Sequence, residues 1–223
     1  MTNILKEVRK VGDFNRIAMK GWGKVTIGQG KEQSLTVEAD EQLMKRITTE
    51  VVDGKLIIDL GRDWMERMSA GLEFLSSREI HFTIVAKNLS SIEISGACEM
   101  EVGALKSDEF DLKMSGASSV KLADLNAKKL VASMPGAGKV VVSGKVNDQE
   151  VMVTGAGNYD ATKLETDNTR VSLTGVGNAT IWAKETLDVS VTGVGSIEYY
   201  GNPRIKQSTT MLGSIRNMGE APK

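Results

Sequence analysis

The sequence predicts an all-β protein built as a single-stranded β-helix, or β-solenoid, with coils of about 20 residues. Three observations predict this fold. A glycine motif recurs at near-constant spacing, apolar residues alternate on both sides of each copy, and only 3 prolines stand against 23 glycines in the 223 residues. One such coil cannot bury its apolar face alone, so the coils must stack on one another.

The glycine motif marks the turn of each coil. Each copy reads apolar-x-apolar-(Ser/Thr)-Gly-small-Gly-polar, as in VTGAGN at 153–158 and LTGVGN at 173–178. Because a corner glycine often needs φ > 0, we expect a valine at Gly155 or Gly175 to lower stability. The first glycines of the copies, which we interpret as structural turns, are Gly96, Gly116, Gly136, Gly155, Gly175 and Gly193, at steps of 20, 20, 19, 20 and 18 residues.

The step length and two further copies indicate the handedness and extent of the solenoid. Left-handed β-helices have strict steps of about 18 residues, so these longer, variable steps favour a right-handed or irregular helix. IAMKGWGKVTI at 17–27 matches VSLTGVGNATI at 171–181 in register, and a degenerate last copy keeps Gly213. We predict a tether at 1–10, an irregular β segment at 11–85 and solenoid repeats at 86–218, the last two continuous in one elongated domain.

Residues at equivalent positions of the repeat are expected to stack from coil to coil. Apolar residues at every second position face a core, and a third apolar element adds a third side to each coil. The residue between the glycines forms an apolar ladder at the corner, and another column faces outward. The third element is Leu105, Leu125, Val146 and Leu164; the corner ladder is Ala97, Ala117, Ala137, Ala156, Val176, Val194 and Leu212; the outward column is Glu101, Lys121, Val141, Asp160, Thr180 and Glu198.

The N-terminal segment is predicted to combine strands with a short helix. Strands are expected at 31–40, 53–60 and 78–86, and one or more helical turns within 40–52. An apolar insertion at 61–79 is interpreted as a cap on the open end of the solenoid, with contact to a lipid, another apolar ligand or a partner as the alternative. Its large apolar residues are Trp64, Met65, Met68, Leu72, Phe74 and Leu75.

Composition and charge exclude several classes of protein. The net charge of −1 and the pI of about 6.0 provide no basic excess for nucleic acid. No apolar run reaches the roughly 18 residues of a transmembrane segment, and the start MTNILKEVRK lacks the apolar core of a signal peptide. We therefore expect a cell-envelope protein whose signal is absent from this chain, or a cytoplasmic one if the chain is full length. Oligomerisation stays open.

The residue types that carry most enzyme chemistry are scarce. A dinucleotide fingerprint needs a third glycine, and the three best copies have Asp160, Thr180 and Glu198 there. His81 is the only histidine and Cys98 the only cysteine, so a Cys/His metal set is impossible and nothing indicates a serine partner for a triad. We predict no catalytic, cofactor-binding or metal-binding residues.

Polysaccharide lyases and hydrolases are often β-helices, which keeps open the alternative of a carbohydrate-active, pectinase-like enzyme. Asp160 and Glu198 are expected two coils apart in the outward column, about 9–10 Å at the usual strand spacing. That separation lies at the edge of the range for an inverting pair of carboxyl groups. A solvated ladder of charges explains the same column equally well.

Two aromatic residues provide a better surface signal. Trp182 and Tyr200 each lie seven residues after the first glycine of their copy. Both should point outward on adjacent coils and stack, which suits a sugar ring or a protein partner. The alternative is an interface or a loop that packs over them.

Several segments, in order, resemble one known family. They are FNRIAMKGWGKVTIGQGKEQSLTVEADEQLMKRITTEVVDGKLII at 14–58, AKNLSSIEISGA at 86–97, the TGAGN and TGVG series, and YYGNPRI at 199–205. Together they resemble the head GIN family of autotransporter-type adhesins of bacterial envelopes. The resemblance implies a β-helical protein of the bacterial envelope, although the label "adhesin" transfers little mechanism. Together with the missing catalytic set and the aromatic pair, it leads us to predict a non-enzymatic surface protein that binds a glycan or another protein.

Overall fold

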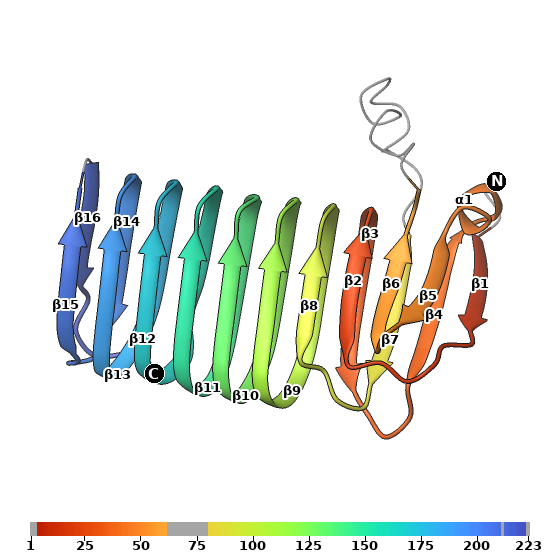
Figure 1. Ribbon diagram of the computed structural model, residues 1–223, viewed down its shortest axis with the longest axis horizontal. Coiled ribbons are helices and arrows are strands. Elements are labelled where there is room, and N and C mark those ends of the chain that lie inside the picture. The colour runs from red at the N-terminus through yellow and green to blue at the C-terminus, as the bar shows by residue number, and fades with distance from the viewer. Residues whose placement is uncertain (1–3, 62–79, 211, 222–223) are drawn as a thin grey trace.

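The computed structural model describes residues 4–61, 80–210 and 212–221, and these residues form a β-solenoid. Figure 1 shows the coils stacked along the long axis of the molecule. The insertion at 61–79, with Trp64, Met65, Met68, Leu72, Phe74 and Leu75, lies outside the described residues except for Gly61. The all-β prediction, with about 20 residues per coil and one short helix, is confirmed.

Each central coil is one long strand that runs through both layers of the solenoid. The first half of a coil follows its glycine motif, bends, and returns as a second half that ends at the next motif (Figure 1). The curved region encloses the third apolar element, Leu105, Leu125, Val146 and Leu164, all at most 4% exposed. They do not form the single column expected: Leu105 pairs with Leu125, but Val146 pairs with Ala127 and Leu164 with Gly144, because the register shifts here. The long strands are β9 (Ala97–Met114), β10 (Ala117–Met134), β11 (Ala137–Val153), β12 (Ala156–Leu173) and β13 (Val176–Val191).

The upstream strands extend both layers toward the N-terminus. One layer continues from β9 through β8 (Ser91–Ile94), β2 (Arg16–Lys20) and β6 (Lys55–Asp59) to β5 (Thr48–Val52). The other continues through β3 (Trp22–Gln29), β7 (His81–Ala86) and β4 (Ser34–Asp40) to β1 (Ile4–Arg9). The upstream copy of the motif, at 17–27, therefore joins the stack, because β3 pairs in parallel with β9.

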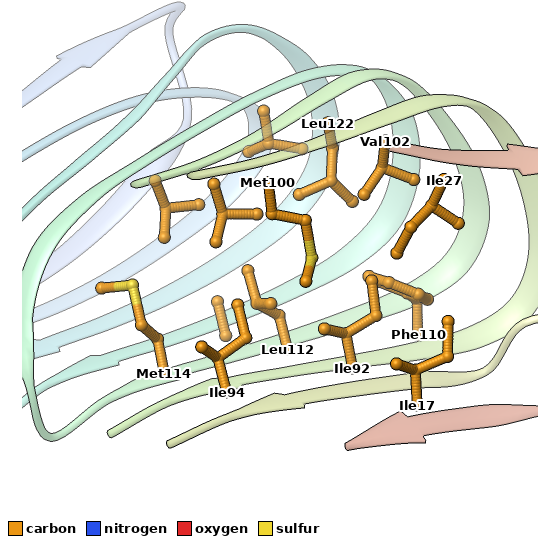
Figure 2. Packing of buried hydrophobic residues seen from close by; sticks show 14 of the residues in the cluster. Ile17, Ile27, Ile92, Ile94, Met100, Val102, Phe110, Leu112, Met114 and Leu122 are labelled. Atoms are coloured by element: carbon orange, nitrogen blue, oxygen red, sulfur yellow. The ribbon is translucent and has the colours of Figure 1, made fainter. Parts of the chain in front are cut away.

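The core lies between the two layers. Figure 2 shows Met100, Val102 and Leu122 from one layer facing Ile94 and Leu112 from the other. All of them are buried and belong to one hydrophobic cluster, whose first and last members in the sequence are Phe14 and Ile197. Alternation with period two therefore built the core as expected: every second side chain of a strand enters the space between the layers.

The N-terminal end differs from the prediction in its first residues. The expected tether at 1–10 is wrong for Ile4–Arg9, because these residues form β1, which pairs antiparallel with β4. Leu5 packs against the core, and the guanidinium of Arg9 donates to the carbonyl oxygen of Ile47 at 2.6 Å. A strand with so polar a sequence is stable here because its charged side chains find partners on the short helix and on β4.

The helical turn predicted within 40–52 is present and short. Helix α1 covers Glu41–Met44, and the Asp40 carboxylate caps it by accepting from the N–H groups of Gln42 and Leu43 at 2.9 and 3.0 Å. The chain then returns to extended structure, because the β-branched residues of β5 pair with β6.

In the C-terminal coil, polar residues replace apolar ones at two positions that face the core in the preceding coil. Strands β14 (Val194–Tyr200), β15 (Arg204–Thr209) and β16 (Leu212–Asn217) form the last turns. The register places Gln207 and Thr209 of β15 beside the buried Val189 and Val191 of β13. These two core-facing positions thus become polar in the last coil, although Ile205 and Ile215 stay apolar beside Leu187 and Ile197. The polar residues let solvent reach this end at little cost.

Candidate functional site

The two edges of the solenoid, where the layers meet, differ in regularity. We call the turn that carries the Gly-x-Gly motif the glycine edge, and the curved turn opposite to it the bend edge. At the glycine edge, Val176 pairs with Ala156 and Val194 pairs with Val176 without a shift. The corner ladder predicted there faces solvent at its C-terminal end: Val176 is 59% and Leu212 78% exposed.

The first glycines of the motif are needed for a different reason from the one expected. None of the six has positive φ, so the cause expected for a loss of stability at Gly155 and Gly175 is wrong. Each instead lies against the equivalent glycine of the preceding coil. A Cβ added to Gly175 would lie 1.9 Å from the carbonyl oxygen of Gly155. Positive φ occurs at second glycines of the motif, Gly138, Gly177 and Gly195.

The bend edge is where the ladder of hydrogen bonds loses its regularity. The pairing of β10 with β11 shifts after Leu122, and that of β11 with β12 after Val141. Between β12 and β13 it shifts twice, after Ala161 and after Thr166. Bulges of this kind re-aim side chains and are often found next to functional sites.

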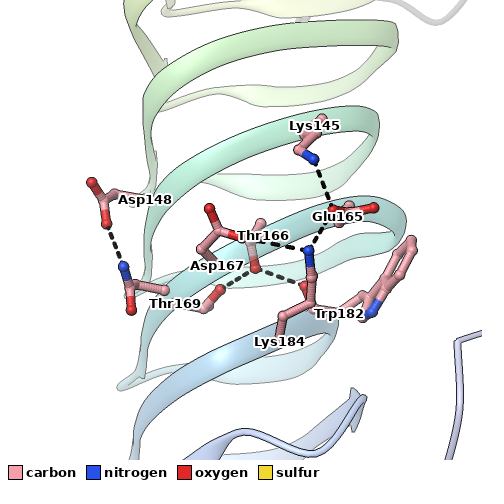
Figure 3. Close-up of polar contacts among 9 residues, drawn as sticks. Lys145, Asp148, Glu165, Thr166, Asp167, Thr169, Trp182 and Lys184 are labelled. Carbon is pink, nitrogen blue, oxygen red and sulfur yellow. Dashed lines mark hydrogen bonds and ion pairs between the residues drawn. The ribbon is translucent and has the colours of Figure 1, made fainter.

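At the double shift, four residues from successive coils form one column along the bend edge. Lys145 pairs in register with Glu165, Glu165 with Trp182, and Trp182 with Tyr200. We call Lys145, Glu165, Trp182 and Tyr200 the bend column. Trp182 and Lys184 flank the buried Ala183, so both side chains point away from the core. Figure 3 shows the indole of Trp182 beside the strand that carries Glu165.

Glu165, in the middle of the bend column, forms ion pairs with two lysines. The Oε1 atom of Glu165 lies 3.0 Å from Nζ of Lys145 and 2.9 Å from Nζ of Lys184 (Figure 3). Lys184 also lies 3.7 Å from Asp167. The hydrogen bonds from Lys184 and Lys145 lower the pKa of Glu165, and the bond to Glu165 raises the pKa of Lys184. Both lysines therefore stabilise the ionised form of the carboxylate.

A buried polar network supports the backbone of Trp182 from inside. The Thr166 hydroxyl donates to the carbonyl oxygen of Trp182 at 2.6 Å and lies 2.6 Å from the hydroxyl of Thr169 (Figure 3). Thr169 contacts Gln149, which in turn donates to the hydroxyl of the buried Tyr159. Burial raises the pKa of Tyr159 above its ordinary range, so this network stays neutral. Such satisfied networks fix the position of the groups they contact.

Each aromatic side chain of the bend column has a polar group that makes no hydrogen bond to the described residues. Trp182 and Tyr200 are half-buried. Among the described residues, no hydrogen bond uses the indole N–H of Trp182 or the hydroxyl of Tyr200. Next to them is Gly201, with φ of +97°, where an added Cβ would lie 2.2 Å from the carbonyl oxygen of Ala183 and 3.6 Å from Cδ1 of Trp182.

The charged members of this site were not predicted. Lys145 lies nine residues after Gly136, Glu165 ten after Gly155, and Trp182 seven after Gly175. Alignment on the glycines therefore places them in different columns, and only the register shifts bring them together. The alternation of charge in Lys145, Glu165 and Lys184, spaced by one coil each, is the signal that could have found them.

The remaining candidates lie elsewhere. His81 is exposed on β7, far along the stack from the bend column. Cys98 is 3% exposed, and burial raises its pKa to about 12, so its thiol is protonated and shielded. In the outward column the register joins Asp160 to Thr180 and Thr180 to Glu198, and Asp160 accepts hydrogen bonds from Thr162.

Metal-binding clusters and membrane-spanning helices are both absent from the described residues. Residues 4–61, 80–210 and 212–221 contain no group of three or more His, Cys, Asp or Glu side chains arranged to hold a metal ion. Within the same residues, no helix has the length and apolar character needed to cross a membrane.

Comparison with known proteins identifies relatives. The profile of a family described as "Putative auto-transporter adhesin, head GIN domain" matches residues 13–203. A "putative adhesin" from Bacteroides fragilis is similar in structure, with a TM-score of 0.88, 27% identity and 97% of both chains covered. A "putative lipid binding protein" from Parabacteroides distasonis shares the fold at a TM-score of 0.73 and 22% identity, again over 97% of both chains. A search of functionally curated proteins found no match.

Proposed function

The chain belongs to the head GIN family of "putative auto-transporter adhesins", and on this premise we propose that it is a non-enzymatic binding protein of the bacterial cell surface. The observation that carries the proposal is the bend column. It combines aromatic rings with a carboxylate held ionised by two lysines, on a scaffold that fixes their positions. These groups suit binding, because aromatic rings provide a large contact area and charged groups orient a ligand through hydrogen bonds.

The arrangement of the carboxylates also supports binding rather than catalysis. General acid–base catalysis needs two groups whose environments push their pKa values apart. Glu165 has its pKa lowered, and its neighbours are lysines rather than a second carboxyl group with a raised pKa. Asp160 and Glu198 are separated by Thr180, and Asp160 is bound to Thr162 of its own strand.

Cell-surface labelling of the native organism tests this function. Intact cells treated with a membrane-impermeant biotin reagent should yield the labelled protein, and a deletion strain should bind less to its natural surfaces. The purified protein should bind those surfaces directly and release no product from them. A protein that stays unlabelled until the cells are lysed would contradict the proposal.

A second candidate function is the binding of a lipid or another apolar ligand. It is favoured by the apolar residues of the insertion 61–79, such as Trp64, Met68 and Leu72, and by the name of the lipid-binding relative. Organic extraction of the purified protein, followed by mass spectrometry, should then recover lipid. A variant in which a short Gly-Ser linker replaces 62–79 should recover none, and equal amounts from both proteins would exclude this role for the insertion.

A further inference from the structure

We propose that the bend column is a binding site for a neutral oligosaccharide that lies along the solenoid axis. The inference rests on the proposed binding function and names the class of ligand for it. The column runs over four neighbouring strands, from β11 to β14, and three strand spacings correspond to about 14 Å. A site of this length and direction fits an extended chain of linked rings better than a single small molecule.

The aromatic half of the column would stack on sugar rings. Trp182 and Tyr200 are direct neighbours in the parallel ladder, so their rings follow each other along the axis. The C–H groups on the face of a sugar ring are apolar, and its hydroxyl groups lie around its rim. An aromatic face with an adjacent polar group therefore matches it. The indole N–H and the Tyr200 hydroxyl, which no hydrogen bond among the described residues uses, are available for those hydroxyl groups.

The charged half of the column would accept hydroxyl groups. Both lysines contact Oε1 of Glu165, and within the described part of the chain Oε2 of this residue accepts no hydrogen bond. A carboxylate oxygen with free lone pairs is a strong acceptor for a sugar hydroxyl. Glu165 is 26% exposed, so a ligand can reach it, and the two lysines limit its rotation.

The charge balance indicates a neutral ligand. Lys145 and Lys184 carry two positive charges, and Glu165 and Asp167 carry two negative charges, all within one chain of ion pairs. A glycan rich in uronic or sialic acid would need an excess of positive charge to offset its own. The bend column has none, because Lys145 and the neighbouring Lys184 already have carboxylate partners.

The site can be tested by titration of the purified chain with sugars. The panel should contain neutral oligosaccharides of glucose, mannose, xylose and galactose, with oligogalacturonate as the acidic comparison, and binding should be measured by calorimetry. We expect at least one neutral member to bind and the acidic one to bind more weakly. Trp182→Ala should weaken binding at least tenfold and Glu165→Gln several-fold.

Matched substitutions elsewhere separate this site from general effects. Trp22→Ala removes an indole at the glycine edge, and Glu101→Gln removes a carboxylate that pairs with Lys121 on a flat layer. Both variants should bind sugar like the parent chain. Melting temperatures should be recorded for all variants, and Trp182→Phe, which keeps a ring, replaces Trp182→Ala if the latter fails to fold.

Three results would overturn the inference. They are no binding of any neutral sugar by the folded parent chain, equal losses in Trp182→Ala and Trp22→Ala, or unchanged adhesion to surfaces whose glycans have been oxidised with periodate. The last result would favour a protein partner and leave the proposed surface function intact. An unlabelled protein on intact cells would instead contradict the surface function, whatever the sugar titration gives.

Discussion

The glycine edge and the bend edge close the same coils by opposite means. At the glycine edge, each turn lies on the carbonyl oxygen of the turn before it, and the space beside Gly155 and Gly175 admits no side chain. At the bend edge, neighbouring coils differ in length and their registers shift between Ala161 and Asn168. The glycine edge therefore maintains the spacing of the repeat. The bend edge can vary in length and register while the coils remain stacked. Specific side chains accumulate at the edge that can change.

The largest effect is expected from a side chain at the glycine edge. Gly175→Val would place its Cβ 1.9 Å from the carbonyl oxygen of Gly155, so the coils must separate. We expect a loss of at least about 3 kcal/mol in the free energy of unfolding, the upper part of the range for overpacking. Urea unfolding followed by circular dichroism measures it, with Thr180→Val on a flat layer as the control. An unchanged midpoint would show that the edge tolerates side chains.

A smaller loss is expected when the support of the bend column is removed. Thr166→Val keeps the shape of the side chain but removes its bonds to the Trp182 carbonyl oxygen and to Thr169. Leaving such buried groups unsatisfied costs about 1–2 kcal/mol. Chemical denaturation gives this value, and the fluorescence of Trp182 should report increased motion of the ring. Ser172→Val, on the same strand but facing outward, should leave both readouts unchanged.

Insertions compare the two edges directly. A Gly-Ser pair inserted between Lys184 and Glu185 would bring the shorter β13 coil to the length of its neighbour, and we expect a loss within about 1 kcal/mol. The same pair between Thr174 and Gly175 would displace the glycine from its neighbour and should prevent cooperative folding. Calorimetric melting of both proteins distinguishes these outcomes, and equal melting temperatures would mean that the edges do not differ.

The smallest effect on stability is expected from the ion pairs of the bend column. Lys184→Met should change the free energy of unfolding only slightly, since exposed ion pairs contribute little. It should, however, raise the pKa of Glu165, because Lys184 is the largest cause of its lowering. The small stabilisation of the folded protein by the Glu165–Lys184 ion pair is fully present above the pKa of about 4.3 that a glutamate has in the unfolded chain. It is lost as the pH falls through the lower pKa of Glu165 in the folded protein.

Carboxyl NMR titration of Glu165 measures this shift. Lys128→Met, which removes the partner of Asp108 on another coil, is the control and should leave the titration of Glu165 where it was. If Lys184→Met leaves the pKa of Glu165 unchanged, Lys184 does not hold the carboxylate, and the proposed binding site loses its fixed acceptor.

Much of the fold followed from the sequence because the repeat is local and periodic. The spacing of the glycines and the alternation around Ile92 and Ile94 were sufficient to predict the coils and the buried face. The register of Trp182 beside Tyr200 was also correct, since both residues are seven positions from a glycine. Wherever the coil length is constant, counting from the glycine places a residue correctly.

The prediction was incomplete for residues whose place in the fold is set by their pairing with another coil or strand. Glu165 joins the bend column only through the bulge after Ala161, which no count along one coil reveals. The reason for glycine at Gly155 was likewise misassigned, because its clash is with another coil and not with its own backbone. Strand β1 was missed since its partners lie more than 25 residues away, at 35–40.

The polar residues of the last coil determine how the molecule responds to a pulling force. Gln207 and Thr209 contribute little to the core, and β15 and β16 each pair with one neighbour along the stack among the described residues. A load applied at the C-terminus would peel these strands first, and then one coil at a time. Because each coil contacts only its neighbours, the work is divided into small steps. Force spectroscopy should show a staircase of short extensions, which would let a surface-bound chain lengthen under strain before it releases its ligand.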